Sequence, residues 1–167
     1  GSDSVSSFCD WPEGGMFEYW KLYQNGQFIH YIGMVEEYRM EEAQKEKMSK
    51  SYPFSRDTKI DKFLSIINAL YTITEAHLFA ARLAKAANFT GDVEIITELG
   101  NTDGRVLFFW GEFFRHLSQA YTCRYQPIEE KRIVTAEQLI TNPASIALDL
   151  TIDIFKDFNW KDANKTV

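Results

Sequence analysis

The segment KIDKFLSIINALYTITEAHLFAARLAKAA, residues 59–87, decides the fold of this 167-residue chain. It contains neither Gly nor Pro, Thr58 stands before it as an N-cap residue, and Gly91 follows shortly after its end. At about 100° per residue, one face collects apolar side chains: Ile60, Phe63, Leu64, Ile67, Leu70, Tyr71, Leu78 and Ala81. The polar stripe is narrow, and such a helix is normally buried. The sequence therefore predicts a long central helix.

The stretch before this helix predicts a β-hairpin. Residues 16–24 and 27–36 are rich in aromatic and β-branched residues, and Asn25-Gly26 separates them. Asn-Gly favours a two-residue type I′ turn, because both of its positions need positive φ, and this turn fixes the register. The predicted pairs are Tyr23 with Phe28, Lys21 with His30, Tyr19 with Ile32, Phe17 with Met34, Leu22 with Ile29 and Trp20 with Tyr31.

Both faces of this hairpin are apolar, whereas a hairpin with one solvated face alternates apolar and polar side chains. Two interpretations stay open. Either the rest of the domain covers both faces, or one face is an interaction surface. The candidate contact residues of that surface are Phe17, Tyr19, Trp20, Tyr23 and Phe28.

Strand patterns and two helix starts follow the long helix. Strands are predicted at 92–99, 105–110 and 120–126, with a turn over Glu129–Arg132. Thr135 and Gln138 fit a capping box, and Asn142-Pro143 begins a last helix. Hairpins rather than alternating βα units predict an α+β fold, with an antiparallel sheet packed on the long central helix and a C-terminal helix.

One domain over residues 11–160 is predicted, with 1–10 as a tag remnant and disordered lead-in and 161–167 as a flexible tail. The 18 basic and 24 acidic residues give a net charge of −6, which argues against nucleic-acid binding through bulk charge. Apolar runs fall short of the roughly 20 residues that a membrane helix needs. Cys9 and Cys123 match no zinc spacing, and two reduced cysteines are typical of a cytoplasmic protein.

The sequence carries none of the short motifs of nucleotide-binding, zinc-protease, hydrolase or calcium-binding proteins, so no catalytic residue, metal or cofactor is predicted. The tentative ligand-binding residues are His30, Thr74, Glu75 and His77. The last three lie in or near the apolar face of the long helix, where a polar group needs a partner. That partner is either a neighbouring backbone group or a ligand in a pocket between helix and sheet. His30, His77 and Glu75 could also hold a divalent metal if the fold brought them together.

Residues 45–62 carry six basic and three acidic side chains, interleaved with Tyr52 and Phe54. The two interpretations are a small nucleic-acid footprint and a solvated loop. His116 supports no specific role. Glu36 and Glu37, after the hairpin, are expected to be exposed.

Three segments resemble a known family: Trp20–Tyr31, Leu70–Glu75 with Phe79–Ala84, and Ala147–Trp160. Together they are similar to the C-terminal region of bacterial proteins whose N-terminal part is a Schlafen-AlbA_2-type DNA-binding domain. The resemblance implies a bacterial accessory domain without catalysis of its own, with nucleic acid bound only by an upstream domain.

The leading hypothesis is thus a non-catalytic interaction domain of a bacterial cytoplasmic protein, with a protein partner or a second copy of the chain and no membrane partner. The alternatives are a small-molecule-sensing domain, and an enzyme or nucleic-acid-associated protein that lacks a short motif.

Overall fold

The computed structural model describes residues 3–11, 16–51, 60–109, 117 and 119–163. Its elements in chain order are β1 (Ser4–Trp11), β2 (Met16–Tyr23), β3 (Phe28–Ile32), α1 (Val35–Arg39), α2 (Glu42–Ser51), β4 (Phe63–Ser65), α3 (Ile66–Ala86), β5 (Asp92–Leu99), β6 (Val106–Phe108), β7 (Ile128–Thr135), α4 (Ala136–Thr141) and α5 (Pro143–Asp157). Antiparallel sheets with the long α3 and the C-terminal α5 confirm the predicted α+β fold.

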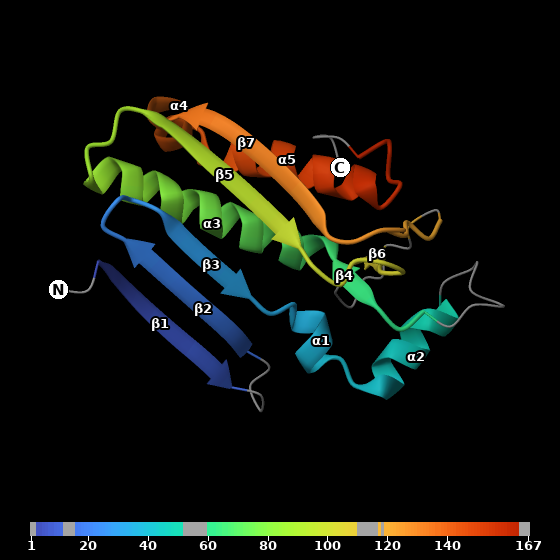
Figure 1. Cartoon of the computed structure of the whole chain (residues 1–167). Helices are drawn as coiled ribbons and strands as arrows, with labels where there is room; N and C mark the ends of the chain where they lie inside the picture. The colour runs from blue at the N-terminus through green and yellow to red at the C-terminus, as the bar shows by residue number, and fades with distance from the viewer. Residues whose placement is uncertain (1–2, 12–15, 52–59, 110–116, 118, 164–167) are drawn as a thin grey trace.

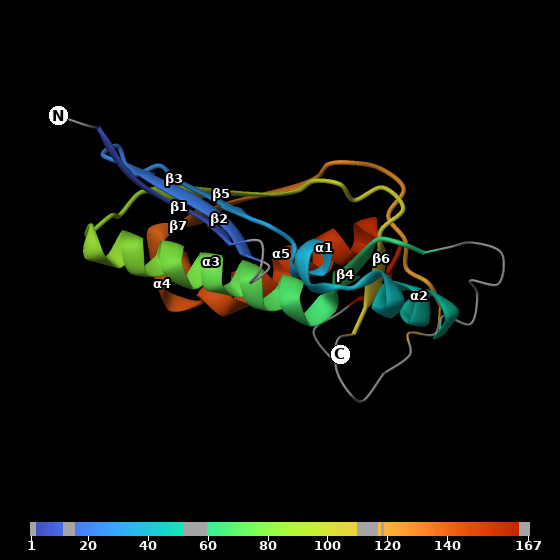
Figure 2. The ribbon, with the colours of Figure 1, turned by 90° about the horizontal axis from the view of Figure 1, so that it is seen from below.

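The strands form three small sheets. One is the antiparallel sheet β1-β2-β3, a second is the antiparallel pair β5-β7, and the third is the parallel pair β4-β6. Figure 1 shows α3 running along the molecule between the first two sheets. Seen from below in Figure 2, these two sheets lie on one side of the molecule, and α3, α4 and α5 lie on the other.

The main core lies where α3 packs on α5 and where the β5-β7 pair covers both helices. Its buried apolar residues include Ile66, Ala69, Ile73, Leu99, Leu107, Ile128, Ala147, Leu150, Ile154, Phe155 and Phe158. A smaller cluster joins the end of α1 to β4 and β6: Met40, Ile60, Phe63, Val106 and Phe108. Among the side chains described in β1, β2 and β3, none is buried, so the three-stranded sheet stands outside both clusters.

The central helix begins later than the pattern predicts. Residues 63–65 form β4, whose three side chains are buried and whose backbone pairs in parallel with β6. Ser65 then caps α3, since its hydroxyl accepts a hydrogen bond from the Asn68 amide at 3.2 Å. Thr58, the predicted cap, lies outside the described residues. Helical periodicity alone could not separate a short buried strand from the helix that follows it.

The predicted hairpin exists, but its register is wrong by one residue. Trp20 lies opposite His30 and Leu22 opposite Phe28, rather than opposite Tyr31 and Ile29. The Tyr23 amide donates to the Gln27 carbonyl, which leaves a three-residue connection. Of Asn25 and Gly26, only Gly26 has positive φ, at 87°, so a type I′ turn cannot form and a longer glycine-containing loop replaces it.

The second half of the chain mixes confirmed and corrected predictions. The capping box is confirmed: Thr135 accepts from the Gln138 amide while the Gln138 side chain accepts from the Thr135 amide. The predicted turn over Glu129–Arg132 is wrong, because these residues belong to β7 and pair with residues 95–98 of β5. The predicted strand 120–126 reduces to one bridge between Thr122 and Val106.

Sequence analysis assigns residues 1–10 to a disordered lead-in, but residues 4–10 form most of β1, which pairs with the whole of β2. Within the described part of the chain, no helix is long and apolar enough to cross a membrane.

Candidate interaction surface

The helix α3 separates the four tentative ligand residues. His77 is buried on the side of α3 that faces the core, and Thr74 is half-buried. Glu75 is exposed and lies about 200° around the helix from His77. His30 lies on β3 next to Phe28, whose ring contacts the Phe79 ring at 4.6 Å. Phe79 is also about 200° from His77, so His30 and His77 lie on opposite sides of α3.

His77 is held by its own helix. Its Nδ1 donates to the Ile73 carbonyl at 2.8 Å, so its Nε2 is the unprotonated nitrogen of the neutral ring. This Nε2 is buried and has no hydrogen-bond partner among the described residues. Burial lowers the pKa of His77, and the nearby Arg132 charge lowers it further, against the opposing effect of the bond to Ile73. The ring is therefore neutral at physiological pH.

His30 has a different partner. Its Nε2 lies 2.8 Å from the Glu18 carboxylate on the neighbouring strand β2. Both residues are on the face of the sheet that carries Trp20 and Phe28. Within the described ranges, no three His, Cys, Asp or Glu side chains are close enough to hold a metal ion. The three-ligand arrangement of His30, Glu75 and His77 is not assembled.

The five candidate contact residues occupy two faces of the sheet. Phe17, Tyr19 and Tyr23 share one face with Tyr31, and Trp20 and Phe28 share the other. We call these the outer face and the α3 face. All five side chains are half-buried. The sheet meets the body of the domain on the α3 face, through the contact of Phe28 with Phe79.

Sequence analysis missed three strongly exposed apolar residues of this sheet, which lie on β1. Val5 and Trp11 project from the α3 face with 66% and 57% of their surface exposed, and Phe8 projects from the outer face with 61% exposed. Figure 1 shows β1 as the strand of this sheet that lies farthest from α3. The sequence pattern that could have indicated this strand is Val5, Phe8 and Trp11 among small residues, but the start of the chain was interpreted as a polar lead-in.

The backbone of β1 is also open along one edge. No described strand pairs with the side of β1 away from β2. The Gln24 amide donates to the Asp3 carbonyl, so odd-numbered residues of β1 bond to β2 and even-numbered residues direct their amides and carbonyls outward. Ser6, Phe8 and Asp10 thus present backbone donors and acceptors at the free edge.

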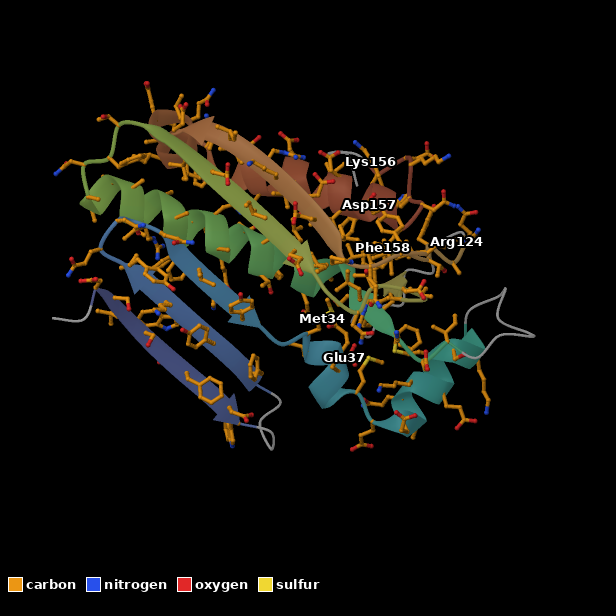
Figure 3. The ribbon with its side chains drawn as sticks, viewed as in Figure 1. Met34, Glu37, Arg124, Lys156, Asp157 and Phe158 are labelled. Atoms are coloured by element: carbon orange, nitrogen blue, oxygen red, sulfur yellow. The ribbon has the colours of Figure 1, made fainter. Side chains whose placement is uncertain are left out.

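Both glutamates after the hairpin make structural contacts: Glu37 is exposed as expected, whereas the expectation is wrong for Glu36. Glu36 is buried, and its Oε1 accepts from the Ser65 amide at 2.9 Å and from Asn68 Nδ2 at 3.3 Å. Glu37, labelled in Figure 3, binds the Arg105 guanidinium. Arg105 is fully buried and donates to the carbonyls of Phe63 and Asn101 as well. This cluster ties α1 to the start of α3.

A second polar group lies at the C-terminal end of α5, where Figure 3 labels Arg124, Lys156 and Asp157. Lys156 Nζ lies 2.6 Å from Asp153, which also binds Arg132 of β7. Burial and a hydrogen bond to Asp157 raise the pKa of Tyr125. The phenol therefore stays protonated at physiological pH and cannot serve as a base there.

The basic stretch 45–62 is largely paired where the structure describes it. Lys45 lies 3.2 Å from Glu42, Lys50 lies 2.7 Å from Glu46, and Lys62 donates to Asn101. Tyr52, Phe54 and the basic residues Arg56 and Lys59 lie outside the described residues, as does His116.

Comparisons of the chain with protein-family models, with curated proteins and with solved structures found no match.

Proposed function

We propose that this chain is a non-catalytic interaction domain that associates with a second copy of itself through the sheet β1-β2-β3. One observation carries the proposal: this sheet bears aromatic and aliphatic side chains on both faces, and none of those described is buried. A small sheet gains stability by packing an apolar face against another layer. Among the described residues, the ring contact of this sheet with α3 is that of Phe28 with Phe79, and the apolar side chains Val5, Phe8 and Trp11 of β1 remain exposed.

The distribution of charge supports a second copy as the partner. The strands β1, β2 and β3 carry two acidic side chains, Asp10 and Glu18, and one basic side chain, Lys21. The strands β5 and β7 carry five acidic and two basic ones. Two copies of a chain with net charge −6 repel each other least where the sheet is nearly neutral. The three-stranded sheet is that surface.

Sedimentation velocity on matched variants tests the proposal. Phe8→Ser removes an apolar side chain that is 61% exposed on the three-stranded sheet, and Ile133→Ser removes one that is 62% exposed on the β5-β7 pair. We expect Phe8→Ser to weaken self-association and Ile133→Ser to leave it unchanged. A wild-type chain that stays monomeric at every accessible concentration would contradict the proposal.

The wider role is part of the same proposal. An accessory domain in a bacterial cytoplasmic protein, next to an upstream DNA-binding domain, is what the resemblance of residues 20–31, 70–84 and 147–160 implies. The reading frame upstream of Asp3 tests it. A DNA-binding domain encoded there supports the accessory role, and a start codon immediately before Asp3 contradicts it.

A second candidate function is small-molecule sensing. The observation in its favour is the buried Nε2 of His77, which lacks a hydrogen-bond partner in the described structure and could accept one from a ligand. A thermal-shift screen of small polar metabolites on the wild type and on His77→Leu tests it. Sensing requires a compound that stabilises the wild type and leaves the variant unaffected.

A further inference from the structure

We propose that self-association joins the free edge of β1 to β1 of the second copy, antiparallel, so that the two three-stranded sheets become one continuous six-stranded sheet centred on Phe8. This inference rests on the proposed function and names how the partner binds. An exposed strand edge is a ready template for another strand, and natural proteins normally block it with proline, lysine, a bulge or a covering element.

The edge of β1 carries neither the proline nor the lysine that normally blocks an exposed strand. The strand Ser4–Trp11 is eight residues long, contains no proline and no lysine, and carries a single charge at Asp10. Every residue from Val5 to Trp11 is exposed. The pairing with β2 continues without a bulge from Ser4 to Trp11, so the outward amides and carbonyls form a regular row. A regular and accessible row is what antiparallel pairing requires.

The parity of the outward groups restricts the register. Even-numbered residues carry the outward backbone groups. In an antiparallel pair, each even-numbered residue of one β1 must therefore lie opposite an even-numbered residue of the other β1. Complete overlap of the two strands would put Ser4 opposite Trp11, an even number against an odd one, and is excluded. The two remaining registers with the longest overlap are centred on Ser7 and on Phe8.

Side-chain pairing favours the register centred on Phe8. There, Phe8 lies opposite Phe8 of the second copy, and Val5 lies opposite Trp11, so apolar side chains meet across the interface. The register centred on Ser7 would instead place Phe8 opposite Ser6. Apolar pairs across strands stabilise a sheet more than an aromatic side chain opposite a serine does.

The single charge of β1 also fits this register. Asp10 lies opposite Ser6 of the second copy, and Ser6 is the neighbour of Lys21 on β2 within its own sheet. All three are on the outer face, and the small serine leaves room for Lys21 to approach Asp10. The Lys21 ammonium is on that face already, 4.5 Å from the Tyr23 ring. The two Asp10 carboxylates are kept apart, four residues from each other along the strand direction.

Ser6→Pro separates this edge pairing from other modes of self-association. Proline removes the outward amide of Ser6, which is not used in the pairing with β2, and proline is tolerated at such an edge. Ser6→Ala is the matched control, because it removes the hydroxyl and keeps the amide. Each substitution occurs twice in a symmetric pair, so we expect Ser6→Pro to raise the dimer Kd on the order of 100-fold and Ser6→Ala only a few-fold.

The outcomes distinguish the two proposals. If the wild type dimerises and Ser6→Pro dimerises equally well, or if Ser6→Ala loses the dimer to the same extent as Ser6→Pro, the edge pairing is overturned. Self-association would then occur through a face of the sheet. A monomeric wild type overturns both. A wild-type monomer that binds an extended peptide at this edge also overturns the second copy as occupant.

Disulfide mapping tests the register and does not depend on the proline variant folding. In the register centred on Phe8, position 7 lies opposite the exposed Cys9 of the second copy, in a pair without backbone bonds where the side chains come closest. Mild copper-phenanthroline oxidation of Ser7→Cys should therefore link residue 7 of each copy to Cys9 of the other, as read by peptide mass spectrometry. Links between two residues 7 would indicate the register centred on Ser7, and a wild-type Cys9 link would indicate a further shift. Either result overturns the proposed register.

Discussion

Lowering the pH should destabilise this protein through His77. In the folded chain the ring is buried with 2% of its surface exposed, and burial lowers the pKa of His77 below its usual value of 6.5. In the unfolded chain the ring is solvated and titrates near 6.5. As the pH falls through 6.5, His77 therefore binds a proton in the unfolded state but stays unprotonated in the folded state. Stability is fully present above this value and is lost below it.

The size of the loss follows from this linkage. While only the unfolded state is protonated, the free energy of unfolding falls by about 1.4 kcal/mol per pH unit. Between pH 6.5 and pH 5.0 the loss reaches at most about 2 kcal/mol, and it stops where the folded ring itself takes up a proton. Small domains are stable by roughly 5–15 kcal/mol, so a loss of this size is measurable.

The assay is urea unfolding of the wild type and of His77→Leu at a fixed protein concentration between pH 7.5 and pH 5.0, followed by circular dichroism. The variant removes the ionisable ring and keeps a side chain of similar volume. Its loss of the hydrogen bond to Ile73 is independent of pH and adds only a constant offset. In the difference between the free energies of unfolding of the two proteins, the contributions of the carboxylates and the other histidines cancel. A difference that stays constant over this pH range would refute the reasoning.

Two further predictions concern stability. Arg105→Met should lower the free energy of unfolding by about 3–5 kcal/mol in urea titrations, because it leaves Glu37 and the carbonyls of Phe63 and Asn101 without their donor. Arg105→Lys should not restore it, since a single ammonium cannot replace a fork of donors, and a loss below about 1 kcal/mol would contradict the role. Thr135→Ala should cost about 1 kcal/mol by removing the cap of α4, whereas Thr141→Ala, at the other end of this helix, should cost less.

The elements that sequence predicted well are those specified by local chemistry. The 21-residue helix α3 follows from its uninterrupted apolar pattern, and α4 follows from the reciprocal bonds of Thr135 and Gln138. Strand β5 shows a period of two, and burial alternates along it as that period requires. In each case the residues that determine the element lie within the element.

The predictions were wrong where residues far away in sequence determine the local structure. The strand β4 depends on pairing with β6, more than 40 residues later, and β7 holds its charged residues extended because β5 is beside it. The hairpin register depended on whether Asn25 takes positive φ, which the dipeptide permits but does not enforce. A shift of one residue moved Phe28 from the face of Tyr23 to that of Trp20, which the predicted register had placed alone on its face.

The candidate ligand residues show the same limit. Helical periodicity placed His77 on the apolar face, where it is buried, but could not show that α3 stands between it and His30. The sequence indicates an exposed Glu36 because its partners, Ser65 and Asn68, are far away in sequence. The ion pair of the exposed Glu37 with Arg105 was not predicted for the same reason.

The most direct test of the account is amide hydrogen exchange at β1, measured by NMR at a low and a high protein concentration. Ser7 and Cys9 bond to β2, and their exchange should be slow at both concentrations. The amides of Ser6 and Phe8 point outward, and their exchange should be fast at the low concentration and slow at the high one, where a second copy covers them. Fast exchange of Ser6 and Phe8 at both concentrations would contradict the claim that β1 is completed by a second chain.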